Sequence, residues 1–363
     1  MNKLPSDWQI KTLNEVCFPS SSNIAYKDVK DKKGNYPIFG SSGIVAYADF
    51  YSKEKECLGI VKDGSVGKIF LLPAKSSVIS TLNYLENTDL SDIKYLYYFL
   101  HRINFSKYIK GSVIPHIYFR DYKKEKIPLP PLATQKEIAA RLDFSFDKIE
   151  KGIKYLKLAK ENIIEYKQSM LKYAFEGKLT DSNIIFKNIR DWKELQFSEC
   201  VNKISIKHKI KQKHYLKNGK YPIIDQGQNF ISGYSNDELT INIKKPVIVF
   251  GDHTRCFKFV DFDFIAGADG IKILEPKEFF NEKLFYYFCL ILDFPNKGYS
   301  RHYQYLAKTI MRIPPLETQK EIVSILDKSF ESADNMLKYV EDSLDKAELL
   351  KRALLRDAFN AKL

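Results

Sequence analysis

Two stretches of the chain repeat their apolar residues every seven positions, which is typical of long helices packed along one seam. In the first stretch the repeat runs through Leu142, Ile149, Leu156, Ile163 and Met170, and Ile138 begins the alternate seam position. In the second stretch one set of positions holds Leu326, Ala333, Val340, Ala347 and Leu354, and the other holds Ile322, Ser329, Met336, Ser343 and Leu350. The pattern predicts two helices of about 65 Å each, at 1.5 Å per residue.

Both helices have sequence signals at their ends. Thr134 and Glu137 form a capping-box pattern, in which the Thr hydroxyl accepts a backbone N–H and the Glu carboxylate reaches back to the Thr N–H. Thr318 and Glu321 repeat this pattern, and a Pro-Pro-Leu sequence that cannot continue a helix precedes each pair. The sequence therefore predicts helices that begin at Thr134 and Thr318. Gly177 is expected to cap the end of the first.

The chain as a whole is a tandem repeat with an offset of 184 residues. Asp7-Trp8 recurs as Asp191-Trp192, and Thr134-Gln135-Lys136-Glu137-Ile138 recurs as Thr318-Gln319-Lys320-Glu321-Ile322. Between the tryptophan and the Pro-Pro pair the match fades to fragments. A duplicated helical scaffold with two diverged globular parts explains this. The expected segments are a globular domain at 1–133, a helix at 134–179, a linker at 180–190, a second globular domain at 191–317 and a second helix at 318–363.

The short linker predicts the direction of the second helix. Eleven residues reach at most about 40 Å, and each globular domain is about 35 Å across. The second domain would then sit near the far end of the first helix, and the second helix would run back antiparallel. We expect two globular domains separated by an antiparallel coiled coil. Helices that pair between two chains, or that dock another protein, stay open as alternatives.

Short apolar runs bounded by turn residues predict strands in both globular segments. They lie at Cys57–Val61, 68–72, 246–250 and 270–274, whereas 95–100 and 284–292 favour short helices. The expected fold class is α+β, with two α/β globular domains in a pseudo-twofold tandem repeat.

Composition and net charge indicate which kind of partner and which cellular location to expect. A formal net charge of +13, most of it in the globular segments, favours a polyanion such as nucleic acid. No run of about 18 apolar residues could span a membrane, and no signal-peptide stretch opens the chain, so we expect a cytoplasmic protein. The five cysteines are scattered and form no CxxC pair, which favours buried free thiols over disulfides or a zinc site.

Candidate nucleic-acid contacts lie in loops and in one lysine-rich segment. Residues 202–214 alternate, so a strand there would place Lys207, Lys209 and Lys211 in one row facing phosphates, although a solvated edge strand explains the pattern equally well. Glycine-containing loops at 62–68 and 251–255 follow strands, and polar, aromatic and basic loops at 110–117 and 298–304 precede the helices. Arg255 could bind guanine through two hydrogen bonds, and the amides near residue 226 could bind adenine. Ordinary structural turns are the alternative for each loop. The candidate contacts are Lys62, Ser65, Lys68, Lys110, Ser112, His116, Lys207, Lys209, Lys211, Gln226, Gln228, Asn229, His253, Thr254, Arg255, Ser300, Arg301, His302 and Tyr303.

The sequence lacks the motifs of an enzyme. The segment from Gly64 to Lys68 has the wrong spacing for an ATP-binding P-loop, and no Asn/Asp-Pro-Pro-aromatic methyltransferase motif is present. The six histidines have no metal-ligand spacing, and no serine or cysteine elbow accompanies Asp252 and His253. We therefore expect neither catalytic nor metal-binding residues here.

The helical tails resemble the repeated region of the specificity subunits of type I restriction-modification systems. The pattern is Ile127-Pro128-Leu129-Pro130-Pro131-Leu132, then Thr134 to Ile138, then the heptad helix and Leu171-Lys172-Tyr173-Ala174-Phe175-Glu176-Gly177-Lys178-Leu179-Thr180, and it returns at 313–363. The loop at 60–67 is also similar to that family's first domain. Thr134 and Thr318 depart from the Glu that many members carry, and the second tail has Asn360-Ala361 instead of the glycine.

The resemblance implies a non-catalytic subunit with two target recognition domains, each reading one half of a split, asymmetric double-stranded DNA site. The helices would space the domains and dock two methyltransferase subunits, and motor-nuclease subunits would complete the complex. No cofactor is expected in this chain, since S-adenosylmethionine, ATP and Mg²⁺ belong to the partner subunits. Two alternatives stay open: a coiled-coil scaffold whose basic domains bind nucleic acid non-specifically, and the specificity subunit of another multi-subunit restriction class.

Overall fold

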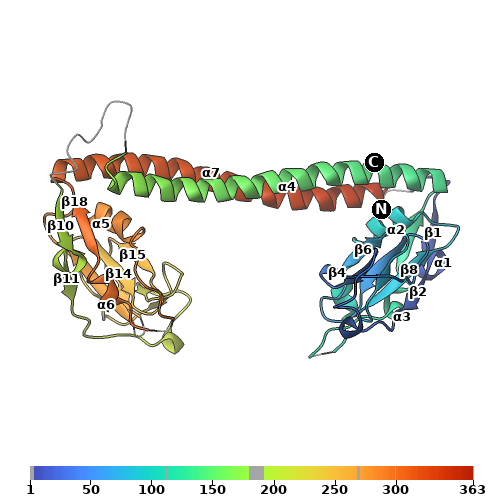
Figure 1. Cartoon of the computed structure of the whole chain (residues 1–363), viewed down its shortest axis with the longest axis horizontal. Coiled ribbons are helices and arrows are strands. Elements are labelled where there is room, and N and C mark those ends of the chain that lie inside the picture. The colour runs from blue at the N-terminus through green and yellow to red at the C-terminus, as the bar shows by residue number, and fades with distance from the viewer. Residues whose placement is uncertain (1–3, 112, 180–191, 268–269, 299, 363) are drawn as a thin grey trace. The chain divides into compact units, whose positions relative to one another are not determined.

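A computed structural model describes residues 4–111, 113–179, 192–267, 270–298 and 300–362 (Figure 1). The chain forms two compact units, one made of Met1–Lys157 with Glu341–Leu363 and the other of Leu158–Val340. Each unit contains one globular domain and part of both long helices. The predicted linker at 180–190 lies outside the described residues.

The first globular domain is built on an antiparallel four-stranded sheet in the order β2-β8-β5-β6. Smaller sheets have the orders β4-β3-β7 and β1-β9. The strands are β1 (Gln9–Thr12), β2 (Cys17–Ser21), β3 (Tyr36–Gly40), β4 (Gly43–Ala48), β5 (Cys57–Val61), β6 (Ile69–Leu72), β7 (Ser77–Val78), β8 (Leu82–Asn87) and β9 (Lys126–Leu129). The helices are α1 (Leu13–Val16), α2 (Ile93–Leu100) and α3 (Phe119–Tyr122). All five residues of β5 are buried, because both faces of this central strand are covered.

The second globular domain repeats this topology, with sheet orders β11-β17-β14-β15, β13-β12-β16 and β10-β18. Its strands are β10 (Lys193–Gln196), β11 (Val201–Ile204), β12 (Tyr221–Ile224), β13 (Gly233–Ser235), β14 (Val247–Gly251), β15 (Phe257–Val260), β16 (Ile265–Ala266), β17 (Ile271–Pro276) and β18 (Ile310–Ile313). Its helices are α5 (Glu282–Cys289) and α6 (Tyr303–Leu306). Both domains mix helix and sheet, which confirms the predicted α+β class. The apolar strands predicted at 57–61, 68–72, 246–250 and 270–274 and the short helices predicted at 95–100 and 284–292 are present, with ends shifted by at most three residues.

The long helices are α4 (Leu132–Phe175) and α7 (Leu316–Ala358). The predicted starts at Thr134 and Thr318 are wrong by two residues. The N–H of Gln135 already donates to the carbonyl of Pro131 at 3.0 Å, and that of Gln319 donates to Pro315 at 3.0 Å. The two threonines therefore lie inside the first turn, where they cannot act as caps, because the carbonyls of Pro131 and Pro315 already accept helical hydrogen bonds.

Gly177 ends α4 as predicted. It has a φ of 66°, its N–H donates to Ala174 at 3.3 Å, and the Lys178 N–H donates to Tyr173 at 2.8 Å. This is the double hydrogen bond of a Schellman cap. At the end of α7, Ala361 takes the same left-handed conformation with a φ of 54°.

The two long helices run antiparallel within each unit. In the first unit, Glu150 of α4 forms an ion pair with Lys351 of α7. Ile138 of α4 and Ala358 of α7 line the same pocket. In the second unit, Lys167 Nζ lies 2.6 Å from Asp334 Oδ1. The predicted antiparallel direction is thus found inside both units.

The seam follows the predicted heptads only in part. Ile138, Leu142, Ile322, Leu326 and Val340 are buried, and Ile149, Leu156, Ile163, Met170 and Leu354 are half-buried. The prediction that Met336 and Leu350 lie between the helices is wrong, because their side chains are 47% and 50% exposed. An α-helix has 3.6 residues per turn, so a strict seven-residue repeat drifts out of the contact unless the helix supercoils.

A fully buried glutamine fastens each long helix to a globular domain. Gln135 accepts the N–H of Asp92 at 2.9 Å and donates to the carbonyls of Leu90 at 3.0 Å and Pro130 at 2.8 Å. In the second unit Gln319 makes the equivalent bonds, to the residues Asn281, Phe279 and Pro314, at 2.7, 2.9 and 2.9 Å. The helix and the domain are therefore joined in the same way in both repeats.

An aspartate eight residues, or about two turns, after the glutamine of each helix adds a second connection. Asp143 accepts from Lys94 Nζ and from the Tyr98 hydroxyl, each at 2.6 Å. Asp327 accepts from Lys283 Nζ at 2.6 Å and from the Tyr287 hydroxyl. These bonds fix how α2 and α5 sit against the long helices.

Among the residues that the structure describes, no helix is both long and apolar enough to cross a membrane.

Candidate nucleic-acid interface

Two loops that the sequence marked separately meet in the first domain. The N–H of Gly64 donates to the carbonyl of Pro115 at 2.9 Å, and the N–H of Ile117 donates to Lys62 at 2.9 Å. Lys110 and His116 exchange two backbone hydrogen bonds of 2.9 and 2.8 Å, so these two residues close the base of a hairpin, of which residue 112 lies outside the described residues. The loop at 62–68 and this hairpin therefore form one surface.

Glycine is required at both turns of this surface. Gly64 and Gly111 have φ values of 80° and 88°, in the left-handed region that other residues rarely adopt. A Cβ on Gly111 would also lie 2.4 Å from the carbonyl oxygen of Ile114. The glycine pattern that drew attention to these loops thus has a conformational cause.

The candidate DNA-contact residues of the first domain differ in their exposure and in their ion pairing. Ser65 and Lys68 are exposed, Lys62 forms an ion pair with its neighbour Asp63, and Lys110 Nζ lies 2.9 Å from Asp121 Oδ1. His116 is half-buried, and Ser112 lies outside the described residues. Such partly paired lysines keep their charge at the surface, where a phosphate could replace the carboxylate.

Sequence reasoning missed the two most exposed apolar side chains of this hairpin. Val113 is 90% exposed and Ile114 is 64% exposed. The sequence could have indicated them, because this aliphatic pair lies between Gly111 and Pro115 and has no periodic apolar neighbours that would predict a core position.

Three loops meet in the second domain. Gln226 accepts the N–H of His253 through its side chain at 3.3 Å, and its carbonyl accepts from the Thr254 hydroxyl at 2.6 Å. His253 Nδ1 lies 3.1 Å from the carbonyl of Ser300, to which it donates. The segments around 226, 251–255 and 300 thus form one surface, as the corresponding loops do in the first domain. Thr254, Gln228, Asn229 and Arg301 are exposed on it, and Gln226, His253 and Ser300 are half-buried.

His302 and Tyr303 are not at this surface, contrary to the prediction. They are 0% and 8% exposed. His302 Nδ1 donates to the carbonyl of Asp252 at 2.9 Å, and the Tyr303 N–H donates to Asp252 Oδ1 at 2.7 Å. The loop folds back onto Asp252, so these two buried residues hold the loop to the domain and are not available at its surface.

Arg255 is also held by the protein itself. Its guanidinium lies over the ring of Phe294, 4.5 Å from the centroid, and donates to the Phe294 carbonyl at 2.7 Å. In this arrangement Arg255 is half-buried, and its guanidinium does not present the pair of free N–H donors that a bidentate hydrogen bond to guanine requires. The prediction of a bidentate contact is therefore not met by the side chain as it stands.

A buried lysine supports the amide-rich loop, and sequence reasoning missed it. The side chain of Lys258, on β15, is 4% exposed, and its Nζ donates to the carbonyls of Asp225 at 2.8 Å and Asn229 at 2.5 Å. Burial lowers the pKa of Lys258, and the nearby Asp225 carboxylate acts in the opposite direction. The ammonium thus fixes the backbone that presents Gln228 and Asn229.

The predicted lysine strand at 202–214 is wrong. Strand β11 ends at Ile204, and the chain then leaves the sheet. The N–H of Ile210 donates to the carbonyl of Ala266 at 3.0 Å, and the buried Ile210 side chain joins a small core cluster. Lys207, Lys209 and Lys211 are exposed, but on an irregular segment and not as one row on a strand.

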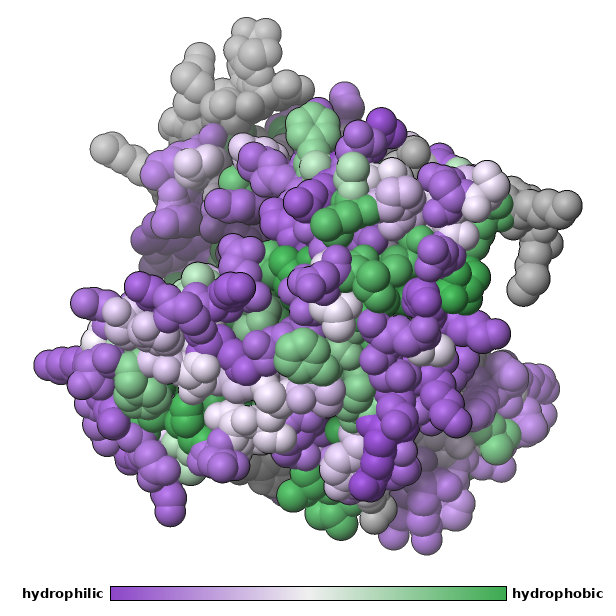
Figure 2. All heavy atoms as spheres, turned by 90° about the vertical axis from the view of Figure 1, so that its right-hand side faces the viewer, coloured by the Kyte–Doolittle hydropathy of each residue, from purple (hydrophilic) through white to green (hydrophobic). Residues whose placement is uncertain are grey.

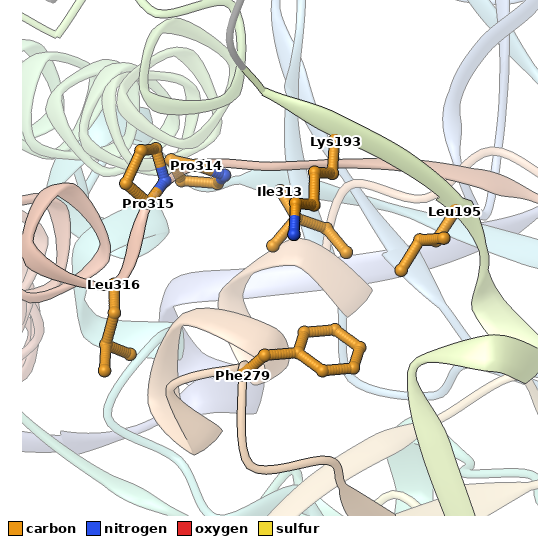
Figure 3. Close-up of a pocket in the computed structure, with 7 residues that line it drawn as sticks. All are labelled: Lys193, Leu195, Phe279, Ile313, Pro314, Pro315 and Leu316. Carbon is orange, nitrogen blue, oxygen red and sulfur yellow. The ribbon is translucent and has the colours of Figure 1, made fainter.

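A separate apolar pocket lies beside the start of α7. It has a volume of about 600 Å³ and is lined by the residues shown in Figure 3, which are Lys193, Leu195, Phe279, Ile313, Pro314, Pro315 and Leu316. Phe279 and Leu316 are exposed, and their counterparts in the first domain, Leu90 and Leu132, are exposed too. Figure 2, seen from the side on which Figure 1 draws the first domain, shows apolar patches among mostly hydrophilic residues. Exposed apolar residues therefore lie at the start of the long helix in both repeats.

The cysteines are free thiols, and most of them are buried. Cys17, Cys57, Cys200 and Cys289 are buried free thiols, as predicted, and Cys256 is half-buried. Within the described residues, no cluster of three or more His, Cys, Asp or Glu residues could hold a metal ion.

A family model described as "Type I restriction modification DNA specificity domain" matches residues 5–157 and 189–338. The chain belongs to this family. Its members are the non-catalytic DNA-recognition subunits of type I restriction-modification systems. The two matched ranges begin 184 residues apart, as the two repeats do, and each ends within a long helix.

Relatives of the chain are named as specificity subunits of type I restriction enzymes. The chain is 25% identical over 356 residues to the putative type I restriction enzyme specificity subunit S.HindORF215P of Haemophilus influenzae, which covers 92% of this chain and 90% of that protein. It is 28% identical over 235 residues to the type I restriction enzyme MjaVIII specificity subunit of Methanocaldococcus jannaschii, covering 60% of this chain but only 54% of that relative. The chain therefore spans about half the length of this second relative.

Solved structures share the fold. One, from work on complex assembly and conformational transition of the type I R-M system, has a TM-score of 0.74 at 14% identity and covers 100% of both chains. The HsdS subunit from Thermoanaerobacter tengcongensis has a TM-score of 0.53 at 15% identity and covers 99% of this chain and 98% of that one.

Proposed function

We propose that this chain reads a bipartite DNA site for a type I restriction-modification complex, with one half-site read by each globular domain. The observation that carries the proposal is the contrast between scaffold and loops. Sheet order and helix connections are the same in both repeats. The loops that converge on the candidate surface carry different side chains, so two different half-sites are expected.

The surface chemistry supports DNA as the ligand. Exposed lysines around both loop clusters would contact phosphates and supply most of the affinity, whereas amides, hydroxyls and apolar tips would contact base edges and supply discrimination. The net charge of +13 adds long-range attraction. A chain with this role works where the chromosome is, and we propose a cytoplasmic location.

We further propose that two methyltransferase subunits dock on surfaces that both repeats share. Exposed apolar side chains are frequent on the long helices, including Phe144, Tyr155 and Leu158 of α4 and Tyr339, Leu349 and Leu350 of α7. Met336 also belongs to this exposed set, so it stays a candidate for docking although it is not in the seam. Motor-nuclease subunits would join through the methyltransferases, and S-adenosylmethionine, ATP and Mg²⁺ would act in those partners.

The experiment is a genome-wide map of adenine methylation in the host with and without this gene. A bipartite motif with a fixed unspecified spacer should lose its methylation on deletion and regain it on complementation. The competing idea, a scaffold that binds nucleic acid without sequence preference, predicts no motif and an affinity that depends on salt but not on sequence. Unchanged methylation while the partner methyltransferase genes are expressed would contradict the proposal.

A further inference from the structure

The hairpin of the first domain presents two aliphatic side chains at a basic surface. Val113 and Ile114 are 90% and 64% exposed, although isoleucine and valine are among the residues most often buried. Both are β-branched, so their side chains have few rotamers and lose little freedom when they contact a ligand.

The hairpin keeps this tip away from the core. Lys110 and His116 close its base with two backbone hydrogen bonds, and the carbonyl of Pro115 accepts from Gly64 at 2.9 Å in the neighbouring loop. His116 Nδ1 also lies 3.2 Å from the carbonyl of Ile114, to which it donates. The tip is thus supported from both sides, and its apolar side chains are left in solvent.

The neighbours of the tip favour a nucleic acid over an apolar protein surface. Lys62 and Lys68 lie on the adjoining loop, and Lys110 lies at the base of the hairpin. Lys62 and Lys110 are paired with Asp63 and Asp121, so phosphates around a groove would compete with these two carboxylates for the lysines around the tip. Aliphatic side chains have no donor or acceptor, so the feature of a major groove that they can recognise is the C5 methyl group of thymine.

We propose that Val113 and Ile114 contact thymine methyl groups, so that the half-site read by the first domain contains A·T pairs at the position of this tip. The inference rests on the proposed function and adds which bases this loop reads. The corresponding loop of the second domain exposes the polar residues Asn296, Lys297 and Arg301 instead. Thymine methyls therefore matter in the first half-site and not at the matching loop of the second.

The test replaces thymine by uracil, which removes only the methyl group. Binding of the reconstituted specificity–methyltransferase complex to its methylation motif is measured with each thymine of the site replaced in turn. At one or two positions of the first half-site, each uracil should weaken binding about three- to tenfold, the effect of removing one buried methyl group. Uracil in the second half-site serves as the internal control.

A protein variant links the effect to the tip. The double substitution Val113→Ser with Ile114→Ser should weaken binding to the thymine site and abolish the difference between thymine and uracil. The substitution Leu239→Ser, at an exposed apolar residue of the second domain, should leave that difference unchanged. Both sites are at the surface, so unchanged thermal unfolding confirms that the variants fold.

The outcomes separate the inference from the function on which it rests. If the complex binds a bipartite motif but no uracil in the first half-site weakens it, or if the double variant keeps the same ratio of affinities, the inference is overturned and the proposed function stands. A first half-site made only of G·C pairs overturns it as well. If no motif is bound at all, both fail.

Discussion

The ring of Phe359, just after α7, lies 4.8 Å from the ring of Tyr95 in α2, although 263 residues separate them in the chain. Phe359 also contacts Phe99, with ring centroids 5.4 Å apart. In the other unit, Phe175 at the end of α4 lies 4.4 Å from Phe288 of α5. The core of each globular domain is therefore completed by the end of a helix that belongs to the other repeat.

This contact predicts that the first unit depends on the last helical turn. Replacing Phe359 by Ala should lower the free energy of unfolding of the first unit by about 3–5 kcal/mol, because a buried aromatic ring is lost and a cavity remains. Denaturant unfolding with hydrogen exchange at the β5 amides measures the loss. The control is Phe144→Ala on α4, where the ring is exposed. Equal stability of the two variants would show that Phe359 does not pack as described.

The buried glutamine predicts a second, independent effect. Replacing Gln135 by Leu removes hydrogen-bonding partners from the Asp92 N–H and from the carbonyls of Leu90 and Pro130. The loss should be about 2–4 kcal/mol, since buried polar groups without partners are costly. Calorimetric unfolding checks it. Gln168→Leu, at an exposed position of α4, serves as the control and should change stability little.

The scaffold could be predicted because its sequence signals are periodic and local. Heptads over α4 and α7, the continuous apolar run of β5 and the glycine at 177 each report a local geometry. The helix starts were misplaced because the Pro-Pro turn sets the entry, which a Thr-x-x-Glu pattern alone does not reveal. A strict heptad rule also assigned Leu350 to the seam, whereas Lys351 and Leu355 are the more buried residues there.

The candidate site could be predicted only as a set of loops. The sequence identified segments 62–68, 110–117 and 251–255 through their glycines and polar residues, but not that the first two meet. Lys258 has no pattern that marks it as buried, because its partners are backbone carbonyls brought close by the fold. The same holds for the roles of His302 and Arg255, which contact Asp252 and Phe294 across long stretches of chain.

The helix ends predict a stabilising substitution. Ala361 has a φ of 54°, where a Cβ is strained, whereas the equivalent position at the end of α4 is a glycine. Ala361→Gly should raise the free energy of unfolding by about 0.5–1 kcal/mol. The reciprocal change, Gly177→Ala, should lower it by about 1 kcal/mol. Thermal melts of both variants are the measurement, and destabilisation by Ala361→Gly would contradict the assigned conformation.

Thiol chemistry predicts selective labelling. Burial raises the pKa of Cys17, Cys57 and Cys200 to about 12 and that of Cys289 well above its usual value. Burial also raises the pKa of Cys256, whose side chain is only half-buried. Because the thiolate is the reactive form, alkylation of the native protein should reach Cys256 first and should accelerate as the pH rises through the weakly alkaline range.

Mass spectrometry after iodoacetamide treatment locates the labelled residue. Target DNA should slow the reaction of Cys256, since it adjoins the loop at 251–255, whereas non-target DNA should slow it less. Denaturant should make all five cysteines reactive. Fast labelling of a buried cysteine in the native protein would contradict the core described for its unit.

Two lysines of the second domain separate base reading from phosphate binding. Lys258 supports the backbone of Asp225 and Asn229 from inside, so Lys258→Met should loosen the loop that presents Gln228 and Asn229. We expect about a tenfold loss of preference for the second half-site, which corresponds to one lost base contact. The preference for the first half-site should be kept.

Lys207, which is exposed on the irregular segment after β11, gives the matched contrast. Lys207→Ala should reduce affinity for all sequences alike, and the slope of log affinity against log salt should fall by about 0.9 if one phosphate contact is lost. Lys258→Met should leave that slope unchanged, because a buried ammonium releases no counterion. Binding titrations at several salt concentrations with matched and mismatched half-sites measure both quantities. A change of slope with Lys258→Met, or a change of motif with Lys207→Ala, would reverse the assigned roles.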